Sequence, residues 1–369
     1  MGLFGNKADP VKSAALKEAI GALVDPHSGE SLARSQAVER VEVRGDQGEV
    51  DIVLDYPAAS WEPELIALIE QVARTVDGIR NTKVTVAFVS PLGSQQQGKA
   101  MPGVRNIIAV ASGKGGVGKS TTSVNLALAL AAEGARVGLL DADIYGPSQP
   151  KMLGAREEPQ IQEDRSMRPV MAHGLQTMSI GYLVDDETAM IWRGPMVTSA
   201  LMQLLNDTRW DHLDYLIIDM PPGTGDIQIT LSQKVPVAGS VIVTTPQDIA
   251  LLDARKAISM FEKVNVPVLG IVENMALHVC SQCGHIEHIF GEGGGARLAA
   301  DNQVELLGSL PLDLRIRTDL DEGQPTVIRA PDSPITRAYR ETARKLAAVL
   351  GRSLRSGEQD QGPLITIEE

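Results

Sequence analysis

The residues best suited to chemistry lie between Gly113 and Thr121, which read Gly-Lys-Gly-Gly-Val-Gly-Lys-Ser-Thr. They fit the phosphate-loop pattern Gly-x-x-x-x-Gly-Lys-Ser/Thr at every fixed position. Glycines let the backbone curl so that its N–H groups face phosphate oxygens, and the helix that follows adds its positive N-terminal end. Lys119 is predicted to face the β- and γ-phosphates of ATP, and the Ser120 hydroxyl to coordinate Mg²⁺.

A glycine-rich turn without a ligand is the alternative interpretation of this stretch. The loop, however, follows an apolar strand-like run and precedes a helical pattern, which is the context that the motif requires. We therefore predict a nucleotide site with the contact residues Gly113, Lys114, Gly115, Gly116, Val117, Gly118, Lys119, Ser120 and Thr121.

Two carboxylates further along the chain could complete this site. Asp219 ends an apolar run and opens Asp-Met-Pro-Pro-Gly-Thr-Gly-Asp, so it is predicted to hold Mg²⁺ directly or through water, with a helix cap as the alternative. Asp143 lies in Asp-Ala-Asp-Ile-Tyr-Gly-Pro-Ser, a loop that could approach the γ-phosphate and orient water for attack. Spacing alone also allows Asp143 to be a solvated loop carboxylate.

The elements that must position these residues form an alternating pattern after Arg105. Short β-branched runs alternate with helical patterns, which predicts a mostly parallel sheet flanked by helices, with ligands at the carboxyl ends of its strands. The expected strands are 106–111, 136–140, 175–179, 215–218, 240–244, 268–272 and 305–309.

The chain is predicted to have two domains and two connecting or terminal segments. Residues 11–89 show the order helix, strand, strand, helix, strand of a small α/β domain, with a hairpin turn at residues 45–48. Residues 90–104 have the composition of a flexible linker. Residues 105–352 form the larger domain, and the acidic residues 353–369 are expected to be disordered.

Composition excludes several classes of function. The 369 residues are 43% hydrophobic and 22% charged, as in ordinary soluble proteins, and we expect a cytoplasmic location because the start lacks a signal peptide. A net charge of −13 argues against nucleic acid as a partner. Residues 335–350 form a basic amphipathic pattern that could touch a membrane, but the acidic segment after it favours packing on the sheet.

The two cysteines, Cys280 and Cys283, are three positions apart, which favours metal or redox chemistry over a structural disulfide. A four-iron cluster ordinarily takes four thiolates, and a twofold dimer would supply them from two such pairs. His285 and His288 offer an alternative, a structural zinc site of two cysteines and two histidines. An unmetallated turn is a third possibility.

Together the motifs resemble the Mrp/ApbC-type iron-sulfur cluster carriers, a family of phosphate-loop NTPases. These carriers belong to the deviant phosphate-loop ATPases, as do the partition and division-site proteins and the nitrogenase iron protein, and Lys114 marks that group. The resemblance extends over about residues 105–350 and depends on the segments 141–148, 193–196, 219–226, 273–275 and 280–284. The small domain resembles the accessory domain of iron-sulfur assembly proteins, but Ser60 and Trp61 stand where that family often has a cysteine, which favours a docking role.

The resemblance implies specific roles for residues that spacing leaves open. Lys114 reaches the nucleotide of a partner subunit, Asp143 orients the attacking water, and Asn274 recognises the adenine. Cys280 and Cys283 bind a 4Fe-4S cluster that is delivered to apoproteins. The sequence thus favours a homodimeric, ATP-hydrolysing cluster carrier over two alternatives, a partition or positioning switch ATPase and an ATPase with structural zinc.

Overall fold

The computed structural model describes residues 7–93, 100–184 and 194–360. The chain divides into two compact units: residues 1–91 with 347–369, and residues 92–346. Each unit has its own sheet, so each is described by itself.

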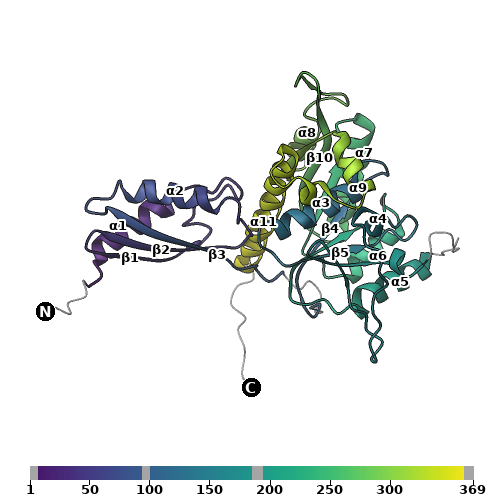
Figure 1. Ribbon diagram of the computed structural model, residues 1–369, viewed down its shortest axis with the longest axis horizontal. Helices are drawn as coiled ribbons and strands as arrows, with labels where there is room; N and C mark the ends of the chain where they lie inside the picture. The colour runs from purple at the N-terminus through teal and green to yellow at the C-terminus, as the bar shows by residue number, and fades with distance from the viewer. Residues whose placement is uncertain (1–6, 94–99, 185–193, 361–369) are drawn as a thin grey trace. The chain divides into compact units, whose positions relative to one another are not determined.

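The first unit is a three-stranded sheet with two helices packed against it (Figure 1). Its strands β1 (Val38–Arg44) and β2 (Gln47–Leu54) form an antiparallel hairpin, and β3 (Asn81–Phe88) pairs parallel with β2. Helices α1 (Pro10–Gly21) and α2 (Glu62–Ala73) contact each other as well as the strands. The hairpin turn is shorter than predicted because Arg44 already pairs with Gln47, leaving only Gly45 and Asp46 between the strands.

The last part of the long helix α11 (Pro334–Asp360) belongs to this first unit. Arg355 forms an ion pair with Glu30 (Nη2 to Oε2, 2.7 Å) and another with Asp55, and Arg352 donates to the Ser28 carbonyl at 2.7 Å. Helix α11 continues to Asp360, so the prediction of disorder from residue 353 is wrong for residues 353–360. The sequence could not indicate this, because Arg352 and Arg355 have partners 300 or more positions away in the chain. Residues 361–369 lie outside the described part.

The second unit contains a larger, mostly parallel sheet in the order β11-β10-β9-β4-β8-β5-β7-β6, with β12 also paired to β10. The parallel strands are β4 (Val104–Ala111), β5 (Val137–Asp141), β7 (Leu175–Ser179), β8 (Leu213–Asp219), β9 (Gly239–Thr244), β10 (Val268–Val279) and β12 (Glu305–Pro311). Two short antiparallel strands, β6 (Val170–Ala172) and β11 (Ile286–Glu287), lie at the ends of that order.

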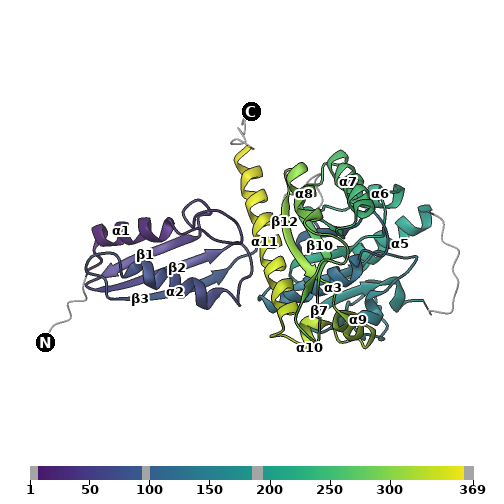
Figure 2. The ribbon, with the colours of Figure 1, turned by 90° about the horizontal axis from the view of Figure 1, so that it is seen from above.

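Helices cover this sheet on both sides, as expected from strands that are buried along their whole length. One face packs on α5 (Gly194–Asp207), α6 (Asp226–Lys234), α7 (Asp248–Lys263) and α8 (Gly294–Asp301) through alternate strand residues such as Ile107 and Ala109. Helix α3 (Lys119–Ala132) packs across β4, β5 and β8, and α11 lies along β12 (Figure 2). The short helices are η1 (Ile180–Tyr182), α4 (Gln149–Met152), α9 (Leu314–Asp321) and α10 (Thr326–Arg329).

These observations confirm the predicted fold class, and every expected strand is found at its place, although β10 extends beyond its expected end at residue 272 to Val279. The helix predicted at 335–350 is packed rather than exposed, since Tyr339, Ala343 and Leu346 are fully buried. Nowhere in residues 7–93, 100–184 and 194–360 is a helix both long and apolar enough to span a membrane.

Candidate functional site

The phosphate loop joins the end of β4 to the start of α3. Gly116 and Gly118 have φ angles of 81° and 82°, which side-chain-bearing residues rarely adopt. Gly113 is required for a different reason, because a Cβ there would lie 2.1 Å from the Asp253 carbonyl oxygen of α7. The glycines therefore serve both the curvature of the loop and its close approach to a neighbouring helix.

A buried ion pair lies at the centre of the site. The Lys119 ammonium is 2.6 Å from Asp219 Oδ1, and the two side chains are 6% and 0% exposed. Lys119 also donates to Ser120 Oγ at 3.1 Å, and Ser123 Oγ donates to the same carboxylate oxygen at 2.8 Å. Asp219 reaches this place because β8 pairs parallel with β4, with Asp219 beside Val110. The structure thus brings Lys119, Ser120 and Asp219 together.

A second carboxylate, Asp141, ends the neighbouring strand β5 beside Asp219. It accepts hydrogen bonds from the backbone N–H groups of Asp143, Ser148 and Gln149 at 3.0 to 3.1 Å, which fixes both ends of the loop between β5 and α4. Burial, with a smaller effect of the nearby Asp219, raises the pKa of Asp141 to about 7. No role was predicted for this residue from the sequence.

Asp143 lies in the loop that Asp141 fixes, and it is half-buried. Burial raises the pKa of its carboxyl group, and the nearby Lys119 ammonium acts in the opposite direction. Asp143 is therefore close enough to Lys119 for the pKa of its carboxyl group to respond to the charge of the lysine.

Sequence reasoning missed Gln149, the first residue of α4. Its side-chain Nε2 donates to the Ser120 carbonyl oxygen at 3.1 Å and to Asp219 Oδ2 at 3.0 Å. A glutamine belongs to no phosphate-loop motif, so the available signal was only its position after a strand end that already carried two aspartates.

A cavity of about 510 Å³ adjoins the loop and contains Gly118, Thr121 and Asn274 in its wall. Asn274 comes from β10, is 4% exposed, and donates its side-chain amide to the Val117 carbonyl oxygen at 2.9 Å. The family resemblance implied that Asn274 recognises adenine, and the structure places it both on the loop and at this cavity. The other walls are formed by α4, α9 and the end of β12.

The two cysteines lie in the turn between β10 and β11. His278 pairs with Glu287 and Val279 with Ile286, and the Cys280 N–H donates to the His285 carbonyl oxygen at 2.9 Å. Cys280 is partly exposed and Cys283 is exposed. The backbone N–H groups of Gln282 and Cys283 lower the pKa of the Cys280 thiol, which favours the thiolate that binds metals.

The alternative zinc site is not assembled within one chain. His288 Nδ1 lies 3.0 Å from the Ala276 carbonyl oxygen, and its Nε2 lies 3.7 Å from Glu292, so the ring is engaged away from the cysteines. Within the described ranges, no three His, Cys, Asp or Glu side chains are grouped so that they could hold a metal ion.

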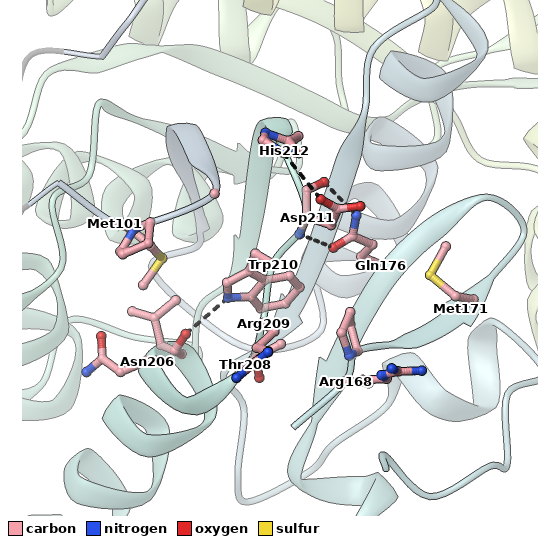
Figure 3. Close-up of a pocket in the computed structure, with 14 residues that line it drawn as sticks. Met101, Arg168, Met171, Gln176, Asn206, Thr208, Arg209, Trp210, Asp211 and His212 are labelled. Carbon is pink, nitrogen blue, oxygen red and sulfur yellow. Dashed lines mark hydrogen bonds and ion pairs between the residues drawn. The ribbon is translucent and has the colours of Figure 1, made fainter. Parts of the chain in front are cut away.

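A larger cavity, of about 810 Å³, lies away from these residues, at the amino ends of β4, β7 and β8 (Figure 3). Most of its polar lining is already paired: Gln176 exchanges two hydrogen bonds with the backbone of Asp211, Trp210 donates to the Leu205 carbonyl oxygen, and Arg209 pairs with Asp164. Ligands of open α/β sheets bind at the carboxyl ends of the strands, and the smaller cavity, not the larger one, lies at that edge of the sheet.

The mostly parallel sheet, the glycine-rich loop after β4 and the buried pair of Lys119 and Asp219 together define a phosphate-loop NTPase. A family model described as NUBPL iron-transfer P-loop NTPase matches residues 103–347, and one described as iron-sulfur cluster assembly protein matches residues 13–86. The first match spans most of the chain, so the chain belongs to the NUBPL iron-transfer P-loop NTPase family.

Relatives and a solved structure agree with this assignment. An iron-sulfur cluster carrier protein of Pseudomonas fragi is 59% identical over 290 residues, which cover 78% of this chain and 100% of the relative. The iron-sulfur cluster transfer protein NUBPL of Mus musculus is 52% identical over 257 residues, covering 69% and 81%. The nucleotide-binding protein of Archaeoglobus fulgidus in complex with ADP is 36% identical, with a TM-score of 0.56 and coverage of 64% and 92%.

Proposed function

We propose that the chain is an ATP-binding and ATP-hydrolysing iron-sulfur cluster carrier that works as a homodimer. The observation that carries this proposal is the course of β10. The middle of this strand presents Asn274 to the phosphate loop, and Cys280 follows immediately after its last residue. A change at the nucleotide can therefore reach the cysteines through a single strand.

The nucleotide site has the donors that Mg²⁺–ATP requires. Backbone N–H groups of residues 113–121 bind the phosphates, and Lys119 exchanges Asp219 for the β- and γ-phosphates. The hydroxyl of Ser120 and the carboxylate of Asp219 are hard oxygen ligands beside the lysine, which suits Mg²⁺. When bound, Mg²⁺ neutralises charge on the phosphate oxygens. Asn274 meets the adenine in the 510 Å³ cavity.

Hydrolysis requires two further residues. Asp143 orients the attacking water, and Lys114 reaches the nucleotide of the second subunit. In the described part of the chain, the Lys114 ammonium forms no hydrogen bond or ion pair, so it is available for that contact. Asp143→Asn should retain nucleotide affinity and lose hydrolysis, measured as phosphate release, because water orientation matters only after binding.

The cargo is a 4Fe-4S cluster held between two subunits. Each chain contributes Cys280 and Cys283, and two chains supply the four thiolates that such a cluster ordinarily takes. Apolar side chains flank the cysteine turn, since Val279 is 42% exposed and Ile286 and Ile289 are both 54% exposed. An exposed apolar patch of this kind suits a subunit contact or a recipient apoprotein.

The test is anaerobic reconstitution with iron and sulfide, followed by native mass spectrometry and metal analysis. We expect one four-iron cluster per dimer in the native protein. Cys280→Ala and Cys283→Ala should each lose the cluster and the cluster-stabilised dimer, because two remaining thiolates cannot hold four irons. His285→Ala and His288→Ala are the matched controls and should retain both.

Other outcomes would support the other functions. One zinc per monomer that depends on the histidines would indicate a structural zinc site. A nucleotide-dependent dimer that never takes up iron would indicate a positioning or partition ATPase. Loss of cluster in the histidine variants as well as the cysteine variants would contradict ligation by four thiolates.

A further inference from the structure

In the side-chain amide of Gln149, the nitrogen has hydrogen-bond partners and, among the described residues, the oxygen has none. The side chain is 1% exposed, and its Nε2 donates to the Ser120 carbonyl oxygen and to Asp219 Oδ2. Its Oε1 is buried without a hydrogen-bond partner. A buried acceptor left unpaired destabilises the folded protein, so such an atom usually marks a missing water or ligand.

The orientation of the Gln149 amide follows from its neighbours. Turning the amide over would place Oε1 against the Asp219 carboxylate and the Ser120 carbonyl, which are both acceptors. Nε2 must therefore face these two oxygens, and Oε1 must be the end that lacks a partner.

Gln149 also connects the carboxylates at the ends of two neighbouring strands. Its backbone N–H donates to Asp141 Oδ2 at 3.1 Å, while its side chain holds Asp219. The two oxygens of Asp219 have different partners: Oδ1 receives Lys119 and Ser123, and Gln149 is the recorded donor to Oδ2. The rotation of the Asp219 carboxylate thus depends on Gln149.

We propose that Gln149 is a positioning residue for the Mg²⁺ site. Its Nε2 fixes the Asp219 carboxylate, and its Oε1 accepts a hydrogen bond from a water molecule bound to Mg²⁺. The inference rests on the proposed function, since it requires Mg²⁺–nucleotide at the phosphate loop. Because Gln149 begins α4 and follows the Asp143 loop, it also links the cation to the loop that orients water.

The test measures nucleotide affinity with and without the cation rather than turnover. ADP is titrated calorimetrically into the native protein, Gln149→Leu and Gln149→Glu, in excess MgCl₂ or in EDTA. The quantity compared is the dissociation constant in EDTA divided by the dissociation constant in MgCl₂, which is large when Mg²⁺ strengthens ADP binding. Gln149→Leu keeps the side-chain volume and removes both polar atoms. We expect the ratio to fall by about 10- to 100-fold, the usual effect of losing a group that orients a metal ligand.

The second variant should retain more of the Mg²⁺ effect than the first. A glutamate at this position adds negative charge beside the cation, so Gln149→Glu should show a larger Mg²⁺ effect than Gln149→Leu. Gln228→Leu is the matched control, because Gln228 is 5% exposed and donates to the carbonyl oxygens of Pro221 and Pro222 in the loop after Asp219. Its ratio should equal that of the native protein.

Three results separate this inference from the proposed function. An unchanged ratio in Gln149→Leu, or equal losses in Gln149→Leu and Gln149→Glu, would overturn the role of Gln149. If the unchanged ratio comes from equal losses of ADP affinity in MgCl₂ and in EDTA, Gln149 only anchors α4. Absence of any Mg²⁺ effect in the native protein would instead contradict the proposed nucleotide site.

Discussion

The two lysines of the phosphate loop differ in their surroundings. Lys119 is buried and paired with Asp219, whereas Lys114 is partly exposed. Removing one member of a buried pair leaves an uncompensated charge, which typically costs about 3 to 5 kcal/mol of stability. Lys119 is therefore the residue to replace in a test of the nucleotide site, and Lys114 in the same loop is the control.

We expect Lys119→Ala to unfold at a lower temperature and to lose stabilisation by ADP, because both the Asp219 partner and the phosphate-facing cation are removed. Lys114→Ala should unfold like the native protein and keep the effect of ADP. The measurement is thermal unfolding with and without Mg²⁺–ADP. A shift on adding ADP that survives in Lys119→Ala would contradict the assigned role of the lysine.

Asp141 predicts a particular pH dependence. Its pKa is raised to about 7 from 3.8, so the folded state binds this proton more tightly than the unfolded chain does. The stability that it contributes is complete below about pH 4 and is lost as the pH rises through about 7.

The Asp141→Asn variant lacks this titration, so its stability relative to the native protein should increase between about pH 5 and pH 8. Taking the difference at each pH cancels the titration of carboxylates that do not interact with Asp141, and urea unfolding at several pH values measures it. A difference that stays constant or falls would show that the native carboxyl is already ionised at pH 5.

For individual residues, the sequence predicts a role only where the residue belongs to a known motif or ends a predicted strand. Lys119 and Ser120 belong to a pattern with one chemical use, so their roles could be predicted. Asp219 could be placed because it ends a strand, and strand ends of parallel sheets meet at one edge. Gln149 and Ser123 could not be assigned, since their partners depend on how β5, β8 and α3 lie together in space.

At the scale of elements, β10 is the longest strand and the largest departure from prediction. The sequence indicated residues 268–272, but the strand extends to Val279 because its end pairs with β11. It is irregular at Met275, where φ is 57° and the pairing with β12 shifts. Apolar alternation ends where this irregularity begins, so periodicity alone could not predict the second half.

Strand β12 and helix α11 pack so closely that one methyl group added between them should destabilise the protein. A Cβ at Gly308 would lie 2.1 Å from Thr342 Oγ1. Gly308→Ala should therefore lose about 1 to 3 kcal/mol of unfolding free energy, the typical cost of overpacking. The measurement is urea unfolding of the native protein and the variant.

A double-mutant cycle supplies the control for this prediction. Thr342→Ala removes the hydroxyl that the new methyl group would meet, so the double variant should be more stable than the sum of the two single effects. Additive effects would show that the cost at Gly308 arises from the strand backbone rather than from the packing of α11.

At the scale of the whole molecule, the boundary between the units does not follow the order of the chain. The sequence separated an N-terminal domain from the ATPase domain at the linker, whose residues 94–99 lie outside the described part. Residues 347–360 nevertheless belong to the first unit. Composition could not predict this, because the assignment depends on ion pairs of Arg355 with Glu30 and Asp55, far away in sequence.

Deleting residues 1–102 should therefore separate α11 into two parts with different behaviour. Residues 334–346 keep their contacts in the second unit, including Arg340 and Arg344 on the buried Glu133. Residues 347–360 lose Glu30, Asp55 and Ser28 as partners.

We expect the fragment to remain folded and to bind ADP, while amide hydrogens of residues 347–360 exchange much faster than in the full chain. Hydrogen exchange read by mass spectrometry measures both, and a fragment that ends at residue 346 is the control and should bind ADP equally well. Unchanged protection of residues 347–360 would mean that the first unit does not hold them, and aggregation of both fragments would mean that the two units share a core.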